Sequence, residues 1–198
     1  MTVKHKYSTS QVVAVAAVIL AVALLRVAFA LRLPEWSNFS PLMAMAFCGG
    51  LFLPGVMAWV LPLAVLLLSN IGLNLALGYD VVSVGQLAVW ACFAVGVGAG
   101  RWLAQKESFG GWAFLGAILG DALLFYVVTN TVSWFSMPVY ARTAAGWVQA
   151  LTTGLPQYAP TWIFFRNSLV SDFLFVGLIL GVRAMALRTS SEATLARS

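Results

Sequence analysis

The sequence has few charged residues. Only 9% of its 198 residues are Asp, Glu, Lys or Arg, whereas 62% are hydrophobic. A soluble domain carries roughly 25% charged residues, because its surface must face water. The shortage of charge therefore excludes a soluble enzyme, a nucleic-acid-binding module and a disordered tail. The net charge of +5 is interpreted as the topology signal of a membrane protein, so no nucleic-acid partner is expected.

Residues that carry out chemistry are also scarce. The one histidine, His5, lies near the N-terminus, and the two cysteines, Cys48 and Cys92, lie inside apolar runs. These features exclude histidine acid–base catalysis, a disulfide framework and a CxxC metal site. The sequence also has no GxxxxGK[ST] loop and no HExxH motif. We therefore expect no catalytic residue, no bound metal and no cofactor; Cys48 and Cys92 are weak candidates for contact with a metal-containing ligand.

Long apolar runs are what the sequence does have, and they occupy residues 12–31, 41–53, 56–77, 84–103, 111–135 and 168–185. At about 20 residues per spanning helix, they predict an all-α, polytopic membrane protein with six transmembrane helices in one bundle, formed by residues 1–187. Residues 188–198 are expected to form a polar cytoplasmic tail. The first run is longer than a signal-peptide core and further spans follow it directly, so it is interpreted as a retained helix.

The stretch 136–167 separates the last two runs and is rich in Trp, Tyr and Pro. We expect it to form an outer loop with amphipathic or short helical pieces. A loop of this length and composition favours a role in covering a binding site.

Basic residues are distributed unequally between the two sides that these spans would define. The side of both termini would carry Lys4, Lys6, Arg101, Lys106, Arg183, Arg188 and Arg197, and the opposite side Arg26, Arg32, Arg142 and Arg166. Because cytoplasmic segments collect Lys and Arg, both termini are expected in the cytoplasm, in a multi-pass protein of the cell (inner) membrane.

Small residues recur every four positions in three of the runs, a spacing that lets helices approach closely in lipid. Gly96 with Gly100, and Gly116 with Gly120, are interpreted as packing positions within the bundle. Ala17 and Ala21 lie on a terminal helix, so they are the best candidates for packing against a partner membrane subunit.

Two carboxyl groups, Asp121 and Asp172, are expected at membrane depth, where an ionisable side chain marks a site, a pathway or a mutual pair. Asp121 is interpreted as a packing or hydrogen-bond centre, and Asp172 as a partner of Arg166 or a cap for local backbone. Asn70 and Asn74 are four residues apart and share one helix face. These asparagines, with Asn130, either tie helices together or contact a ligand.

Several strings suggest a family. NFSPLMAMAFCGGLF from Asn38, LPLAVLLLSN from Leu61, LLFYVVTNTVSWF from Leu123 and FFRNSLVSDFLFVGLILG from Phe164 resemble a family of small bacterial membrane proteins. That family is similar to the S-components of energy-coupling factor (ECF) vitamin transporters, and among those to the solitary cobalamin-transporting S-components. The resemblance implies a six-helix bundle whose outer loops close over a vitamin, and an Ala-rich first helix that meets an energising membrane subunit with its ATPases.

The resulting hypothesis is a substrate-binding transport protein, not an enzyme, that captures a vitamin at its outer face. Cobalamin is the leading named ligand, and other flat, ring-bearing vitamins stay open. Aromatic side chains would stack on a ring while Arg and Asn orient polar groups. The expected binding residues are Asn38, Asn70, Asn74, Asp80, Asn130, Trp134, Tyr140, Arg142, Trp147, Tyr158 and Arg166. The alternatives are a membrane-embedded enzyme that uses Asp121 and Asp172, or a non-transport assembly protein.

Overall fold

The structure is a computed structural model that describes residues 42–106 and 110–195, with side chains up to residue 185, and before them only residues 9, 12–14, 16–17, 21, 24 and 39. The regular secondary structure of the described residues is helical. The helices are α2 (Leu42–Phe52), α3 (Met57–Leu77), α4 (Val84–Ala104), α5 (Gly111–Ser136), α6 (Ala144–Leu151) and α7 (Thr161–Leu195).

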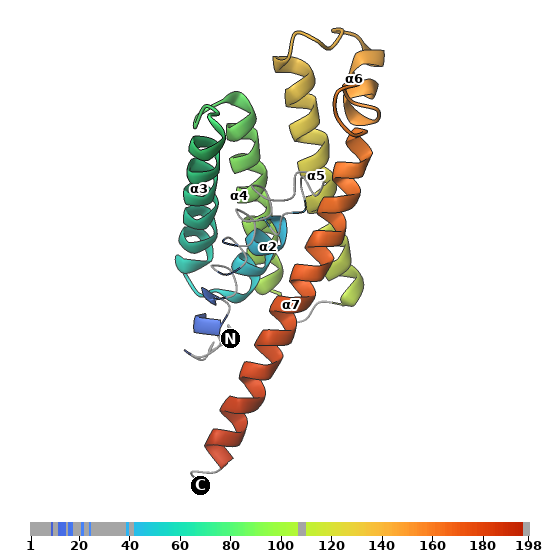
Figure 1. Ribbon diagram of the computed structural model, residues 1–198. Coiled ribbons are helices and arrows are strands. Elements are labelled where there is room, and N and C mark those ends of the chain that lie inside the picture. The colour runs from blue at the N-terminus through green and yellow to red at the C-terminus, as the bar shows by residue number, and fades with distance from the viewer. Residues whose placement is uncertain are drawn as a thin grey trace.

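The helices form two antiparallel pairs, with the short helix α2 packed between them and a second short helix, α6, at one end (Figure 1). One pair consists of α3 and α4, the other of α5 and α7, and α4 packs against α5. The short helix α6 lies at the end of the second pair where α5 ends and α7 begins. The remaining helix, α2, packs against α3, α4 and α7 in the half of the bundle away from α6.

Four helices are long and apolar enough to cross a membrane: α3, α4, α5 and the first 25 residues of α7. A 21-residue helix is about 30 Å long, which matches the hydrocarbon core of a bilayer. The chain is therefore an all-helical membrane protein, as predicted. Of the other two expected spans, the run 41–53 forms α2, which at 11 residues is too short to cross alone. The run 12–31 lies almost entirely outside the described residues.

The predicted boundaries of α7 were wrong at both ends. The expected outer loop 136–167 does contain a short helix, α6, but α7 begins at Thr161, seven residues before the expected start. Polar residues at positions 166 and 167 suggested a loop there, yet Asn167 is buried against the bundle. At the other end α7 continues to Leu195, into the expected polar tail, because residues 186–195 contain neither Gly nor Pro and include several good helix formers.

Helix α2 is the centre of the core, since all of its residues are buried. It packs backbone to backbone against α4: a Cβ atom at Gly50 would collide with the carbonyl of Val97, and one at Gly100 with the carbonyl of Phe47. Gly96 faces Ala46 in the same interface. The prediction that Gly96 and Gly100 pack inside the bundle is thus confirmed.

The second glycine pair, Gly116 and Gly120, does not pack against another helix among the described residues. A Cβ atom at Gly116 or Gly120 would meet nothing within 4 Å among the described residues, and both glycines are exposed on α5. The expectation that this pair also packs within the bundle was wrong. The sequence spacing is the same in both pairs, so spacing alone does not indicate which side of a helix faces the bundle.

Charged side chains from other helices lie at both ends of α2. Asp172 of α7 accepts a hydrogen bond from the backbone N–H of Ala44, in the first turn, over 3.1 Å. At the other end, Arg101 of α4 donates to the carbonyl of Leu53 over 3.3 Å, and the guanidinium of Arg183 lies 4.7 Å from the Phe52 ring. An acidic group at the N-terminus and basic groups at the C-terminus complement the helix dipole and its unpaired backbone groups.

Candidate ligand-binding pocket

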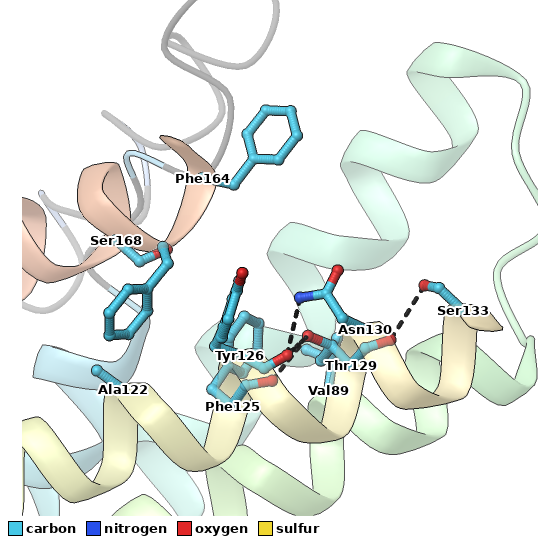
Figure 2. A pocket seen from close by; sticks show the side chains of 10 residues that line it. Val89, Ala122, Phe125, Tyr126, Thr129, Asn130, Ser133, Phe164 and Ser168 are labelled. Atoms are coloured by element: carbon cyan, nitrogen blue, oxygen red, sulfur yellow. Dashed lines mark hydrogen bonds between the residues drawn. The ribbon is translucent and has the colours of Figure 1, made fainter. Parts of the chain in front are cut away.

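A cavity of about 250 Å³ lies between α4, α5 and α7, in the half of the bundle near α6 (Figure 2). Most of its wall is formed by one face of α5, with contributions from the first turns of α7 and a single residue of α4. The lining residues are Val89, Ala122, Phe125, Tyr126, Thr129, Asn130, Ser133, Phe164, Phe165 and Ser168.

Polar side chains of α5 form a row along the cavity, because positions 126, 129, 130 and 133 share one helix face. Thr129 Oγ1 donates to the Phe125 carbonyl over 2.7 Å, Asn130 Nδ2 to the Tyr126 carbonyl over 2.8 Å, and Ser133 Oγ to the Thr129 carbonyl over 3.0 Å (Figure 2). Both hydroxyl donors are thereby used within the helix. The row can therefore mainly accept hydrogen bonds from a ligand, through the hydroxyl lone pairs and the amide oxygen of Asn130.

The rest of the wall is aromatic. Phe125 and Tyr126 come from α5, and Phe164 and Phe165 from α7. The rings of Tyr126 and Phe165 face each other across the two helices, with centroids 4.8 Å apart and an interplanar angle of 38°. Aromatic walls with a few polar groups on one side are the usual composition of a site for a small ring compound.

Tyr126 also attaches α6 to the pocket, because its hydroxyl donates a hydrogen bond to the carbonyl of Leu151 at the end of α6. A second bond between the same helices joins Trp147 Nε1 to Thr131 Oγ1 over 2.9 Å. These two contacts hold α6 against the C-terminal half of α5. A displacement of α6 away from α5 would therefore break the bond made by a residue that lines the pocket.

We expect Tyr126→Phe to loosen α6 while leaving the transmembrane bundle intact. Loss of one such hydrogen bond should lower the free energy of unfolding by about 1 kcal/mol and speed amide exchange in residues 144–151, measured by hydrogen–deuterium exchange. Tyr158→Phe is the matched control, since Tyr158 is 62% exposed. Equal exchange in the two variants would contradict this role for Tyr126.

Of the predicted binding residues that the structure describes, only Asn130 lines the cavity. Three others, Asn70, Asn74 and Asp80, lie near the turn that joins α3 to α4, where they stabilise this helical hairpin. Asn70 Nδ2 donates to Gln86 Oε1 over 3.0 Å, and Asn74 Nδ2 donates to the backbone carbonyl of Asp80 over 3.0 Å. The structure thus gives both asparagines the helix-tying role.

Four more predicted residues gather where α5 meets α6. Trp134 Nε1 donates to the Ala141 carbonyl over 2.8 Å, and the guanidinium of Arg142 lies 6.0 Å from the Trp134 ring. Tyr140 is buried in a small cluster with Ala150 and Leu155, and this burial raises the pKa of its phenol. Trp147 makes the bond to Thr131 described above. These residues build the corner beside the pocket and do not enter it.

The remaining predicted residues are scattered. Tyr158 is exposed, and Arg166 Nη2 donates to Asn167 Oδ1 over 3.0 Å. Ala17 and Ala21 occupy exposed helical positions, whereas Asn38 lies outside the described residues. Cys48 and Cys92 are buried in the core, and neither lines the cavity.

Sequence reasoning missed most of the pocket, although the sequence held a signal for it. Tyr126, Thr129 and Ser133 recur with Asn130 at helical spacing along α5, a polar row inside an otherwise apolar span. Phe164 and Phe165 gave no such signal, because the stretch that contains them was expected to be loop.

These features define a polytopic helical membrane protein with a cavity of about 250 Å³ between three of its apolar helices. The chain belongs to a family of unknown function, DUF6580, and the match covers residues 6–194. No curated protein matches the chain, and no solved structure does.

Proposed function

We propose that the protein is a substrate-binding transport protein of the S-component type, which captures a small, ring-bearing metabolite of the vitamin class between α5 and α7. The observation that carries this proposal is the cavity of about 250 Å³. Its aromatic walls suit a flat ring, and its row of acceptors on α5 suits a ring that carries N–H or O–H groups.

The distribution of basic residues supports an outward-facing pocket. Arg101, Lys106, Arg183 and Arg188 lie at or beyond the end of the bundle away from α6, whereas Arg142 and Arg166 lie near α6. By the positive-inside rule the end away from α6 would face the cytoplasm, and the half of the bundle that contains the pocket would face outward. We propose six spans, of which the run 12–31 and a crossing that includes α2 would be the first two; an even number of spans would leave both termini in the cytoplasm.

The size of the cavity favours a single-ring ligand. Water occupies about 30 Å³ per molecule in the liquid, so the cavity corresponds to roughly eight waters, and pockets for drug-sized ligands begin at about 300 Å³. A corrinoid such as cobalamin is far larger, so α5 and α7 would have to separate widely to hold it. Moreover, Cys48 and Cys92, the two candidate thiols for contact with cobalt, are in the core.

The sequence has no ATP-binding loop, so ATP hydrolysis would have to come from a partner, or transport would have to be passive. Small exposed residues let a partner helix approach closely in lipid. Ala17 and Ala21 provide such positions, and Gly116 and Gly120 on α5 provide a second set. We propose that one of these faces meets a membrane subunit that is coupled to ATPases.

Ligand capture is testable on the full-length protein purified gently from the membrane. Native mass spectrometry should find a co-purifying small molecule, and a thermal-shift panel of pyridoxine, nicotinamide, thiamine, riboflavin and cyanocobalamin should show stabilisation by a single-ring compound. A red preparation stabilised by cyanocobalamin alone would replace the single-ring ligand with a corrinoid. If no ligand is retained and no compound in the panel shifts the melting temperature, the capture proposal is wrong.

A further inference from the structure

Two carboxyl groups are buried inside the bundle, next to the pocket and on its side away from α6. Asp121 on α5 directly precedes the pocket residue Ala122, and Asp172 on α7 follows the pocket residue Ser168 by four positions. Asp121 is 5% exposed and Asp172 is 1% exposed. Both line one narrow space between α2, α5 and α7, which has no room for a water molecule.

The two groups differ in their hydrogen bonding. Asp172 Oδ1 accepts the N–H of Ala44 at the N-terminus of α2, and both this bond and the helix dipole favour the negatively charged carboxylate. Asp172 Oδ2 and both oxygens of Asp121 are fully buried and have no hydrogen-bond partner. A charged carboxylate without a partner is very costly in such a place, so Asp121 is the group that should be neutral.

No positive charge compensates either group within the described part of the chain. The titratable neighbours are the thiols of Cys48 on α2, beside Asp172, and of Cys92 on α4, beside Asp121. Arg101 and Arg183 lie at the opposite end of α2, roughly 15 Å away along the helix axis. On its α4 side, Asp121 packs against Gly96, where a Cβ atom would lie 2.5 Å from Asp121 Oδ2.

We propose that Asp121 and Asp172 form a proton-binding site within the membrane, at which Asp121 carries one proton and Asp172 Oδ2 is the available acceptor. The two carboxyls titrate as a pair. When α5 and α7 separate enough to admit water, the Asp121 O–H bond breaks and the proton passes to that water, which leaves a carboxylate. A hard metal cation suits the site poorly, since such ions take about six oxygen ligands and only three carboxyl oxygens here lack a partner.

Because no ligand enters this reasoning, the site can be tested separately from the proposed transport function. The experiment is infrared spectroscopy of the full-length protein in lipid nanodiscs at neutral pH, where exposed carboxyls are ionised. We expect the C=O stretch of one protonated carboxylic acid. The band should disappear in Asp121→Asn, shift in Asp172→Asn, and stay unchanged in the control Asp80→Asn, because Asp80 is exposed.

A second variant keeps the test decisive if Asp121→Asn does not fold. Gly96→Ala retains the carboxyl but pushes against Oδ2, so the band should change frequency. The proposal is overturned if the wild-type protein has no such band, if the band survives Asp121→Asn, or if Gly96→Ala leaves it unmoved. Loss of the wild-type band on adding sodium chloride at constant pH would also overturn it, in favour of a cation site.

Discussion

Gly100→Ala is expected to destabilise the protein by about 3 kcal/mol, the upper part of the range for overpacking a core. The added methyl group would meet three backbone atoms of α2: the carbonyl oxygen and carbon of Phe47, and the amide nitrogen of Leu51. A flexible side chain can move aside, but two helix backbones in contact cannot move without separating. The measurement is the free energy of unfolding in detergent, obtained by titration with a denaturing detergent.

The control for Gly100→Ala is Gly120→Ala. Gly120 also belongs to a pair of glycines four residues apart in a transmembrane helix. Nothing lies within 4 Å of a Cβ atom there, so the variant should be neutral or more stable by up to about 1 kcal/mol, because alanine is the better helix former. Equal destabilisation by both substitutions would show that α2 and α4 do not meet through Gly100. Gly120→Ala would destabilise only a complex whose partner packs on this face of α5.

Hydropathy was sufficient to locate three of the helices that could cross a membrane, α3, α4 and α5. The expected runs 56–77, 84–103 and 111–135 differ from α3, α4 and α5 by at most one residue at either end. The reason is that lipid allows no unpaired backbone groups, so apolar length nearly fixes helix length. The start of α7 was missed because its first turns lie near the membrane surface, where Trp162, Arg166 and Asn167 are as compatible with a helix as with a loop.

The pocket was harder to predict because it depends on the distance between helices, which hydropathy does not report. Polar residues near the outer side were chosen as candidates, yet Asn70 and Asn74 use their amides to tie α3 to α4 and to the following turn. Asn130 lines the cavity because its face of α5 points toward α7. Sequence spacing identifies residues that share a face, and only the packing of the helices shows what that face meets.

The surroundings of the two buried carboxyl groups, Asp121 and Asp172, were also only partly predictable. Depth along the chain placed Asp121 and Asp172 within apolar helices, and the interpretation of Asp172 as a cap for local backbone was right only in part: Asp172 does accept a backbone N–H, that of Ala44. The capped backbone is not local, however, but belongs to α2, which lies far away in the sequence. Asp121 was expected to be a packing or hydrogen-bond centre: it does pack, buried against Gly96 of α4, but neither of its oxygens has a hydrogen-bond partner.

Ser133→Phe should abolish ligand capture without unfolding the protein. Ser133 lines the cavity from α5, and a phenyl ring added there would fill much of a space of about 250 Å³. We expect the affinity to fall by about 100-fold or more, which corresponds to roughly 2.8 kcal/mol. The measurement is the thermal shift given by the single-ring vitamin that stabilises the wild-type protein most, together with the amount of small molecule that co-purifies.

Ser136→Phe is a close match for this experiment, because it places the same ring on the same helix at an exposed position outside the cavity. Both serines donate to the carbonyl four residues earlier, Ser133 to Thr129 and Ser136 to Val132, so both variants lose an equivalent bond. Ser136→Phe should therefore retain the ligand and its thermal shift. If both variants bind equally well, the ligand does not occupy the cavity between α5 and α7; if both lose binding, the effect arises from α5 as a whole and the cavity has no special part in capture.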